Sequence, residues 1–254
     1  MIEPVTTVSA ILLISNKLLG KTADIVASDI ASLYEQGRNK IINIAARKIP
    51  NIDDGKIANL RVTRDVFFNG SFTDDSICAE YFGGILASSR SLDGKDDSGV
   101  FYADIIKSLS SSQLRLHYII YNSLNELWFK RFKEEEMSLN VGKNSEVTKN
   151  SVFFLTNELE KLDIDIGRDI LAIESKKLIS FAETFNNEAE KLRYARIVPT
   201  TLGIQLYAVA NNKLLEWRKF PIEDFGKFPE IKLPFPFSLS RDDFLIKVKD
   251  AQRA

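Results

Sequence analysis

The residues TADIVASDIASLYEQGRNKIINIAARK, numbered 22–48, carry one continuous apolar stripe. Its members follow at steps of three or four residues and begin just upstream: Leu19, Ala23, Val26, Ile30, Leu33, Gly37, Ile41 and Ile44. Such spacing is typical of one face of a helix. The Thr22 hydroxyl suits the start of this helix, and Arg47 and Lys48 suit its negative end before Pro50. We therefore expect one long helix across this segment.

Proline placement extends the helical interpretation to most of the chain. None of the seven prolines lies between Pro50 and Pro199, and proline is poorly tolerated inside helices. Apolar periodicity predicts further helices at residues 5–19, 61–68, 77–86, 100–109, 111–135, 152–162, 168–189 and 202–210. We predict a mainly α fold.

Two local features mark particular helices. Ser110 and Gln113 match a capping box at the start of the helix beginning at 111. The pair Gly83-Gly84 lies inside the helix at 77–86, which a hydroxyl of Ser71 or Thr73 could cap. Each interior glycine costs about 0.5–1 kcal/mol relative to alanine. We interpret the pair either as a close approach by another helix or as a break.

The pattern changes near Tyr194. Residues 194–198 alternate enough for a short strand. A helix followed by a short strand or hairpin resembles the recognition helix and wing of a winged helix. We therefore expect a helical domain at 1–100, a winged-helix-like domain at 101–212 and an extended tail at 213–254.

The tail is rich in aromatic side chains and proline. Four apolar residues alternate with others in its middle: Leu233, Phe235, Phe237 and Leu239. Two prolines in this segment favour an extended backbone. We expect these side chains to dock either on the chain's own core or on a neighbouring subunit, because exchange of a segment is a common route to homo-oligomers.

Composition limits the classes of function. The 254 residues include 34 basic and 35 acidic side chains, so the net charge of −1 gives no general attraction to nucleic acid. The single cysteine excludes an internal disulfide. The start lacks the basic region of a signal peptide, and the apolar run at 10–14 is shorter than the roughly 20 residues that span a bilayer. We expect a cytoplasmic protein with no membrane span.

Few residues suggest catalysis. His117 is the only histidine and has no partner in the sequence that marks a catalytic pair. Cys78 lies near a helix start, where the dipole could lower its pKa, but a small buried side chain is the commoner role. One cysteine and one histidine cannot build a zinc site of the usual kind. We predict no catalytic residue, cofactor or metal site.

A loop with three carboxylates leaves one metal hypothesis open. Asp93, Asp96 and Asp97 share a glycine-containing loop and could hold a hard cation, as in a metal-dependent hydrolase. Their spacing differs from that of a helix-loop-helix calcium site. The alternative is an ordinary solvated turn.

Binding of DNA requires a local basic surface. The candidates near the predicted wing are Lys176, Lys177, Arg193 and Arg196. Residues 168–190, however, contain three basic and five acidic side chains, a net charge of −2. Because phosphate contacts dominate DNA affinity, this composition disfavours a DNA-reading helix.

Two stretches resemble the abortive infection alpha (Abi-alpha) family of bacterial proteins. The first runs from Asp74 to Tyr121 and includes EYFGGILASSR at 80–90 and IIKSLS at 105–110; the second is IVPTTLGIQL at 197–206. The resemblance extends over residues 18–212, although Gly83-Gly84 and the aromatic tail depart from it. It implies a cytoplasmic, mostly helical protein associated with phage exclusion, and no catalytic residues.

These observations favour a non-enzymatic protein-interaction component of antiphage defence type that forms a homo-oligomer. The alternative is a winged-helix DNA-binding regulator. Both hypotheses involve recognition by surfaces rather than by a reaction centre.

Overall fold

The computed structural model describes residues 23–72, 75–132, 150–188 and 191–253. Helix accounts for 58 % of the structure, in ten helices within these ranges, together with small antiparallel sheets. The mainly α fold is therefore confirmed. The helix expected at 5–19 lies outside the described residues.

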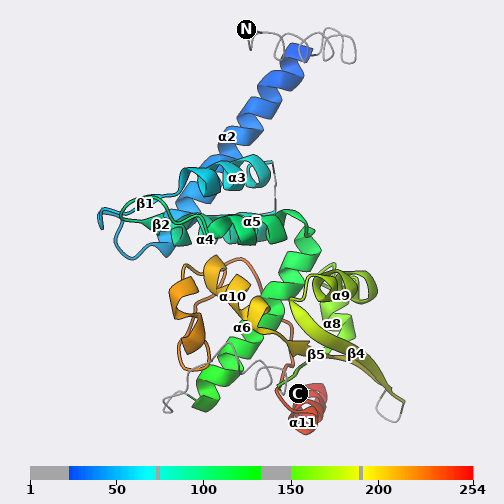
Figure 1. The fold of residues 1–254 in the computed structure, drawn as a ribbon. Helices are drawn as coiled ribbons and strands as arrows, with labels where there is room; N and C mark the ends of the chain where they lie inside the picture. The colour runs from blue at the N-terminus through cyan, green and yellow to red at the C-terminus, as the bar shows by residue number, and fades with distance from the viewer. Residues whose placement is uncertain (1–22, 73–74, 133–149, 189–190, 254) are drawn as a thin grey trace, which may run out of the picture.

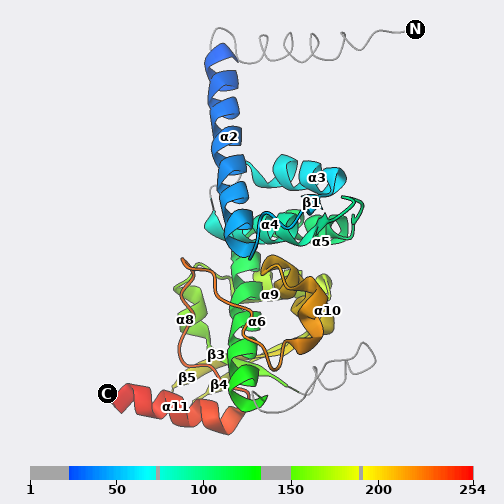
Figure 2. The same cartoon turned by 90° about the vertical axis from the view of Figure 1, so that its left-hand side faces the viewer.

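Four helices form an N-terminal layer. They are α2 (Ala23–Lys48), α3 (Leu60–Gly70), α4 (Ser76–Ser88) and α5 (Gly99–Lys107). The short strands β1 (Ile57–Ala58) and β2 (Arg90–Ser91) pair beside them. Helix α4 packs against the other three, and Figure 2 shows α2 projecting well past them. The predicted helices of this part are confirmed.

The glycine pair permits α4 to contact two other helices closely. A Cβ atom on Gly83 would overlap the side chain of Ile44 in α2, and one on Gly84 would overlap the carbonyl group of Ala210. The helix continues through both glycines, so close approach is confirmed and a break is not. Its N-terminal cap is the Asp75 carboxylate rather than either expected hydroxyl.

Helix α6 (Ser111–Phe132) runs through the middle of the C-terminal part (Figure 1). The capping box is confirmed, because the Ser110 N–H donates to Gln113 Oε1 at 2.9 Å and the Gln113 N–H donates to Ser110 Oγ at 3.3 Å. Helix α10 (Thr201–Ala210) packs against both α6 and α4. It therefore connects the C-terminal part with the N-terminal layer.

A three-stranded sheet lies at one end of α6. Its strands are β3 (Val152–Leu155), β4 (Ile179–Asn187) and β5 (Leu192–Pro199). Two helices, α8 (Thr156–Glu160) and α9 (Ile166–Ser175), lie between β3 and β4 in the chain. The strand order is β3-β5-β4, and both pairs are antiparallel. The strand expected at 194–198 is confirmed as part of β5.

Two expected helices were wrong in part. The segment 152–162 begins as β3, because its first apolar residues pair with β5 and are buried there. The helix expected at 168–189 ends at Ser175, and β4 follows. Lys177 adopts a left-handed conformation with φ of 58°. The Leu178 N–H then donates to the Ile173 carbonyl at 3.0 Å, which closes the helix end.

The segment 213–254 is not extended throughout, contrary to expectation. It contains a 3₁₀ helix, η3 (Leu214–Lys219), and ends in α11 (Arg241–Arg253). Phe244 of α11 is buried against Phe153 and Tyr194 of the sheet. The chain between η3 and α11 is irregular, and it reaches the outer edge of β3, where the Phe153 N–H donates to the Ser238 carbonyl at 3.1 Å.

One continuous hydrophobic core extends from α2 to the segment after η3. The division into domains at residues 100 and 212 stays a prediction. Within the described ranges, none of the helices combines the length and the hydropathy that crossing a bilayer requires.

Candidate functional site

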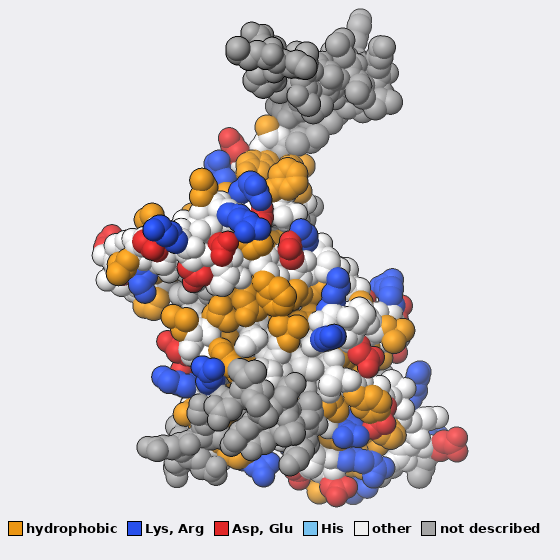
Figure 3. Space-filling view, viewed as in Figure 1, with side chains coloured by type: hydrophobic (Ala, Val, Ile, Leu, Met, Phe, Trp, Pro, Cys, Tyr) orange, Lys and Arg blue, Asp and Glu red, His pale blue; other side chains and the backbone are white. Residues whose placement is uncertain are grey.

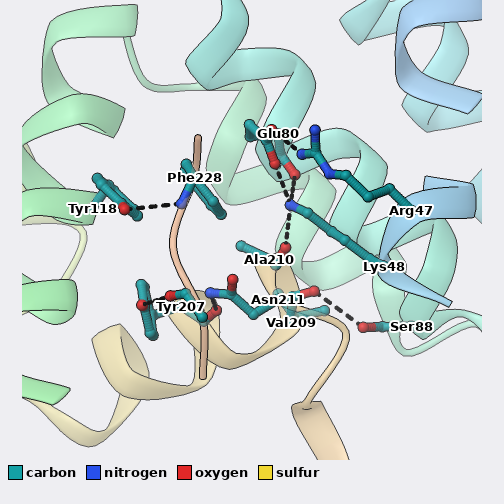
Figure 4. A network of polar contacts seen from close by, with 11 residues as sticks. Arg47, Lys48, Glu80, Ser88, Tyr118, Tyr207, Val209, Ala210, Asn211 and Phe228 are labelled. Atoms are coloured by element: carbon teal, nitrogen blue, oxygen red, sulfur yellow. Dashed lines mark hydrogen bonds and ion pairs between the residues drawn. The ribbon is translucent and has the colours of Figure 1, made fainter. Parts of the chain in front are cut away.

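A buried ion cluster lies where α2, α4 and α10 meet (Figure 4). The Lys48 side chain is only 10 % exposed, and its ammonium group has three acceptors. They are Glu80 Oε2 at 2.6 Å, the Glu80 carbonyl at 2.8 Å and the Ala210 carbonyl at 2.7 Å. Two of these contacts are hydrogen bonds to backbone carbonyls and the third is an ion pair, so the ammonium group is held by three oxygens.

The surroundings explain how a charge is tolerated here. Burial lowers the pKa of Lys48 to about 8, against the opposing attraction of Glu80. Arg47 pairs with the same carboxylate, and the Phe228 ring lies 4.4 Å from the Lys48 nitrogen. Below pH 8 the lysine remains charged. It is held by a carboxylate and two backbone carbonyls, so it is suited to joining elements rather than to nucleophilic attack.

Further hydrogen bonds join the same elements. The Asn212 side-chain amide donates to the Lys48 carbonyl at 2.9 Å, and the Ser88 hydroxyl donates to the Val209 carbonyl at 3.0 Å. We call Lys48, Glu80, Ser88, Ala210 and Asn212 the junction. It ties the N-terminal layer to α10.

His117 is completely buried between α4 and α10. The Tyr81 hydroxyl lies 2.5 Å from Nδ1, and Nε2 lies 3.2 Å from the Gly203 carbonyl. A carbonyl only accepts, so Nε2 carries the proton and Nδ1 accepts from the tyrosine. Burial lowers the pKa of His117 to about 3. The ring is neutral at physiological pH and holds three elements together.

Cys78 is buried in the first turns of α4. Its sulfur lies 3.5 Å from the Ser111 hydroxyl. This position is that of a small core side chain next to a helix start.

The three aspartates of the loop at 91–98 do not converge. Asp93 and Asp96 each accept the backbone N–H two residues further on, at 3.1 and 3.0 Å, and Asp97 pairs with Arg61 at 3.1 Å. Among the described residues, no group of three His, Cys, Asp or Glu side chains is placed to hold a metal ion. The loop therefore offers nothing that supports the metal hypothesis.

The four basic candidates for DNA binding are dispersed. Lys176 and Lys177 are exposed at the end of α9, just before β4. Arg193 is exposed near the start of β5, at the opposite end of the β4–β5 hairpin. Arg196 pairs with Glu183 at 2.9 Å on the neighbouring strand. The structure thus brings only the first two together.

The tail candidates mostly pack on the chain's own core. Leu233, Phe237 and Leu239 are half-buried against it. Phe235 remains 57 % exposed. Other aromatic side chains of the tail are fully buried: Phe220, Phe225, Phe228 and Phe244.

Sequence reasoning missed an apolar surface on the N-terminal layer. Nine of the fourteen large hydrophobic side chains exposed among the described residues lie in the helices of this layer or in the segments that join them. Figure 3 shows hydrophobic side chains along α2 and α3, whereas the broader patch in that view lies lower, where the N-terminal layer borders the C-terminal part. Monomeric proteins rarely expose such groups together without a binding role.

A groove of about 330 Å³ lies within this surface, and we call it the apolar groove. Eight of its lining residues are apolar: Ile42, Ala45, Ala46, Ile49, Ile52, Ala58, Phe67 and Leu86. Its other lining residues are Thr63, Lys56 and Arg90. Ile42 is 41 % and Ile52 61 % exposed. A second apolar stripe beside the buried one, formed by Ile42, Ala45 and Ala46 near the end of α2 and by Ile49 just after it, is the signal that could have revealed it.

Comparison with known proteins provides no relative. No protein-family model, curated protein or solved structure matches the chain.

Proposed function

We propose that this chain is a non-enzymatic protein-interaction component, and that the N-terminal layer binds the partner. The concentration of exposed apolar side chains on that layer carries the proposal. The apolar groove is open and lined mainly by aliphatic groups, which suits an apolar segment of another protein. The junction fixes the layer on α10 through the buried Lys48–Glu80 ion pair and the hydrogen bond from Lys48 to the Ala210 carbonyl.

The family resemblance supplies the biological setting. The stretches 74–121 and 197–206 resemble the Abi-alpha family, which is associated with phage exclusion in bacteria. This resemblance supports a role in antiphage defence in the cytoplasm. The partner recognised by the groove would then belong to the phage or to its host.

A pair of charge insertions tests the proposal. Ile42→Glu and Ile52→Glu would each place a carboxylate in the apolar groove without disturbing a buried side chain. Loss of a central apolar contact typically costs more than 1.4 kcal/mol, or about tenfold in affinity. We expect plaque counts on a host expressing either variant to rise at least about tenfold above those with the unchanged chain.

The control is Leu171→Glu, because Leu171 is 65 % exposed on α9, outside the groove. It should leave protection unchanged. Full protection by both groove variants would contradict the proposal, as would equal loss in all three.

The order of elements favours a second candidate function. In chain order, α6, β3, α8, α9, β4 and β5 follow one another, and the strand order is β3-β5-β4. This order supports the winged-helix hypothesis, in which α9 would be the recognition helix. A DNA regulator would use Lys176 and Lys177 with Arg193 of the hairpin. A gel shift at low salt tests it, because phosphate binding must weaken as salt rises. Absence of binding at low salt would remove this candidate.

A further inference from the structure

The angle between the first half of α2 and the end of α3 is bordered by exposed apolar groups. Figure 2 shows this half of α2 standing clear of the other described helices. The two helices meet closely at Gly37, where a Cβ atom would overlap the Ser71 carbonyl. Just beyond, Leu33 is 50 % exposed, and Phe72 is 54 % exposed with its ring 5.5 Å from that of Tyr34. We call Leu33, Tyr34 and Phe72 the α2–α3 corner.

The sequence directly before α2 predicts a second helix that turns back on it. Residues 5–19, which lie outside the described ranges, have the apolar periodicity of a helix. Gly20 follows them, and Thr22 precedes Ala23, the first residue of α2. Glycine is typical just after a helix and threonine just before one. Residues 20–22 are then the whole connection, and connections of about two to five residues join antiparallel helices.

The length of this segment matches the position of the corner. A helix rises 1.5 Å per residue, so Leu33 lies about 15 Å along α2 from Ala23. Val8 lies about 16 Å before Leu19 in a helix over residues 5–19. In an antiparallel pair that starts at the connection, Val8 therefore comes opposite Leu33. The first turn of the segment then lies near Phe72.

The segment also has an apolar face wide enough for a corner. Two stripes at helical spacing adjoin each other in residues 5–19, one of Val5, Val8, Leu12 and Leu19 and one of Ile11, Ile14 and Leu18. Lys17 is the single charged residue of this segment. A helix that is apolar over so wide an arc is suited to burial between two elements rather than to contact with one.

We propose that residues 5–19 form a helix that packs antiparallel on the first half of α2 and covers the α2–α3 corner. The three-residue connection keeps this segment beside α2 at a high effective concentration, which favours it over a second copy of the chain. Ile42 lies about 14 Å beyond Leu33 along α2, so the apolar groove stays open to a partner. The inference does not rest on the proposed function, and each can fail without the other.

Paired cysteines test this position in the full chain. Val8→Cys is combined with Leu33→Cys, and the matched control combines Val8→Cys with Ile42→Cys, because Ile42 is 41 % exposed on the same helix. The native Cys78 is buried. After mild oxidation and digestion, mass spectrometry measures the linked peptides. We expect at least about tenfold more disulfide within one chain from the first pair, because cysteines whose Cα atoms are more than about 7 Å apart are not bridged without movement.

Hydrogen exchange of the unchanged chain is a second measurement, which decides if a paired variant fails to fold by circular dichroism. A lone helix of about 15 residues is marginal in water. Slow exchange of the amides of residues 8–19, independent of protein concentration, therefore requires packing within the chain. Rapid exchange there, equal linkage in the two pairs, no linkage at all, or a disulfide between two chains would each overturn the proposal.

Discussion

His117 illustrates how one buried side chain determines the response to pH. Its neutral ring accepts from Tyr81 and donates to Gly203, and its pKa is about 3 instead of the ordinary 6.5. The unfolded chain therefore binds a proton on His117 that the folded chain does not. Its contribution to stability is fully present above pH 6.5 and is lost as the pH falls toward 3.

We predict that His117→Gln weakens the pH dependence of unfolding. Between pH 7 and pH 5 this histidine should remove about 2 kcal/mol from the free energy of unfolding of the unchanged chain. Glutamine has no such titration and can still donate near Gly203. Urea denaturation at the two pH values measures the difference between the chains. An identical loss in both would show that another group is responsible.

The ends of helices explain where sequence patterns succeeded and where they failed. Helices with a regular apolar stripe, such as α2 and α6, follow from local spacing alone, and the capping box adds to this signal in α6. The end of α9 does not, because Lys177 occupies a left-handed position usually taken by glycine. Strand β3 was also not predicted from the sequence, because a short buried apolar run has no periodicity that distinguishes a strand from a helix.

Of the two features described for the candidate site, one has a local sequence signal and the other depends on tertiary packing. The apolar groove could have been found from a second stripe on α2, because that signal is local. The junction could not, because Lys48 meets Ala210 only through the tertiary packing of α4 and α10. The sequence predicted Lys48 as a favourable helix end, which says nothing about a partner in another part of the chain.

We predict that Lys177→Gly stabilises the turn between α9 and β4. Glycine adopts a φ near 58° without the steric cost that lysine has there. The carbonyl of residue 177, which accepts from Thr200, is retained. The free energy of unfolding should rise by about 0.5–1 kcal/mol in urea denaturation.

Lys176→Gly is the matched control, because Lys176 is exposed at the end of the same helix with a negative φ of −84°. Glycine should not stabilise that position, since it only adds freedom to the unfolded chain. Equal effects of the two substitutions would contradict the explanation from backbone conformation.

At the scale of the whole molecule, the N-terminal layer and the C-terminal part are held together by close backbone contact. Helix α4 approaches α10 at Gly84, beside the Lys48–Glu80 pair. Four parts of the chain meet there: the end of α2, α4, α10 and the segment around Phe228 (Figure 4). A larger side chain at this point must shift the N-terminal layer relative to the C-terminal part.

We predict that Gly84→Ala destabilises the protein by about 1–3 kcal/mol, because the new methyl group would overlap the Ala210 carbonyl. Gly167→Ala in α9 should do the reverse. Its Cβ would lie 3.6 Å from the nearest Asp165 oxygen, so the gain in helix preference of about 0.5 kcal/mol should remain. Thermal unfolding compares the two variants, and a stable Gly84→Ala protein would show that the two helices are not in tight contact.

The junction also has a consequence for the order of folding. The bonds from Lys48 to Ala210 and from Asn212 to Lys48 close loops of 162 and 164 residues. Closing so long a loop costs chain entropy before any contact compensates for it. We expect the N-terminal layer and the C-terminal part each to form local structure early, and their joining at the junction to be the slow kinetic step.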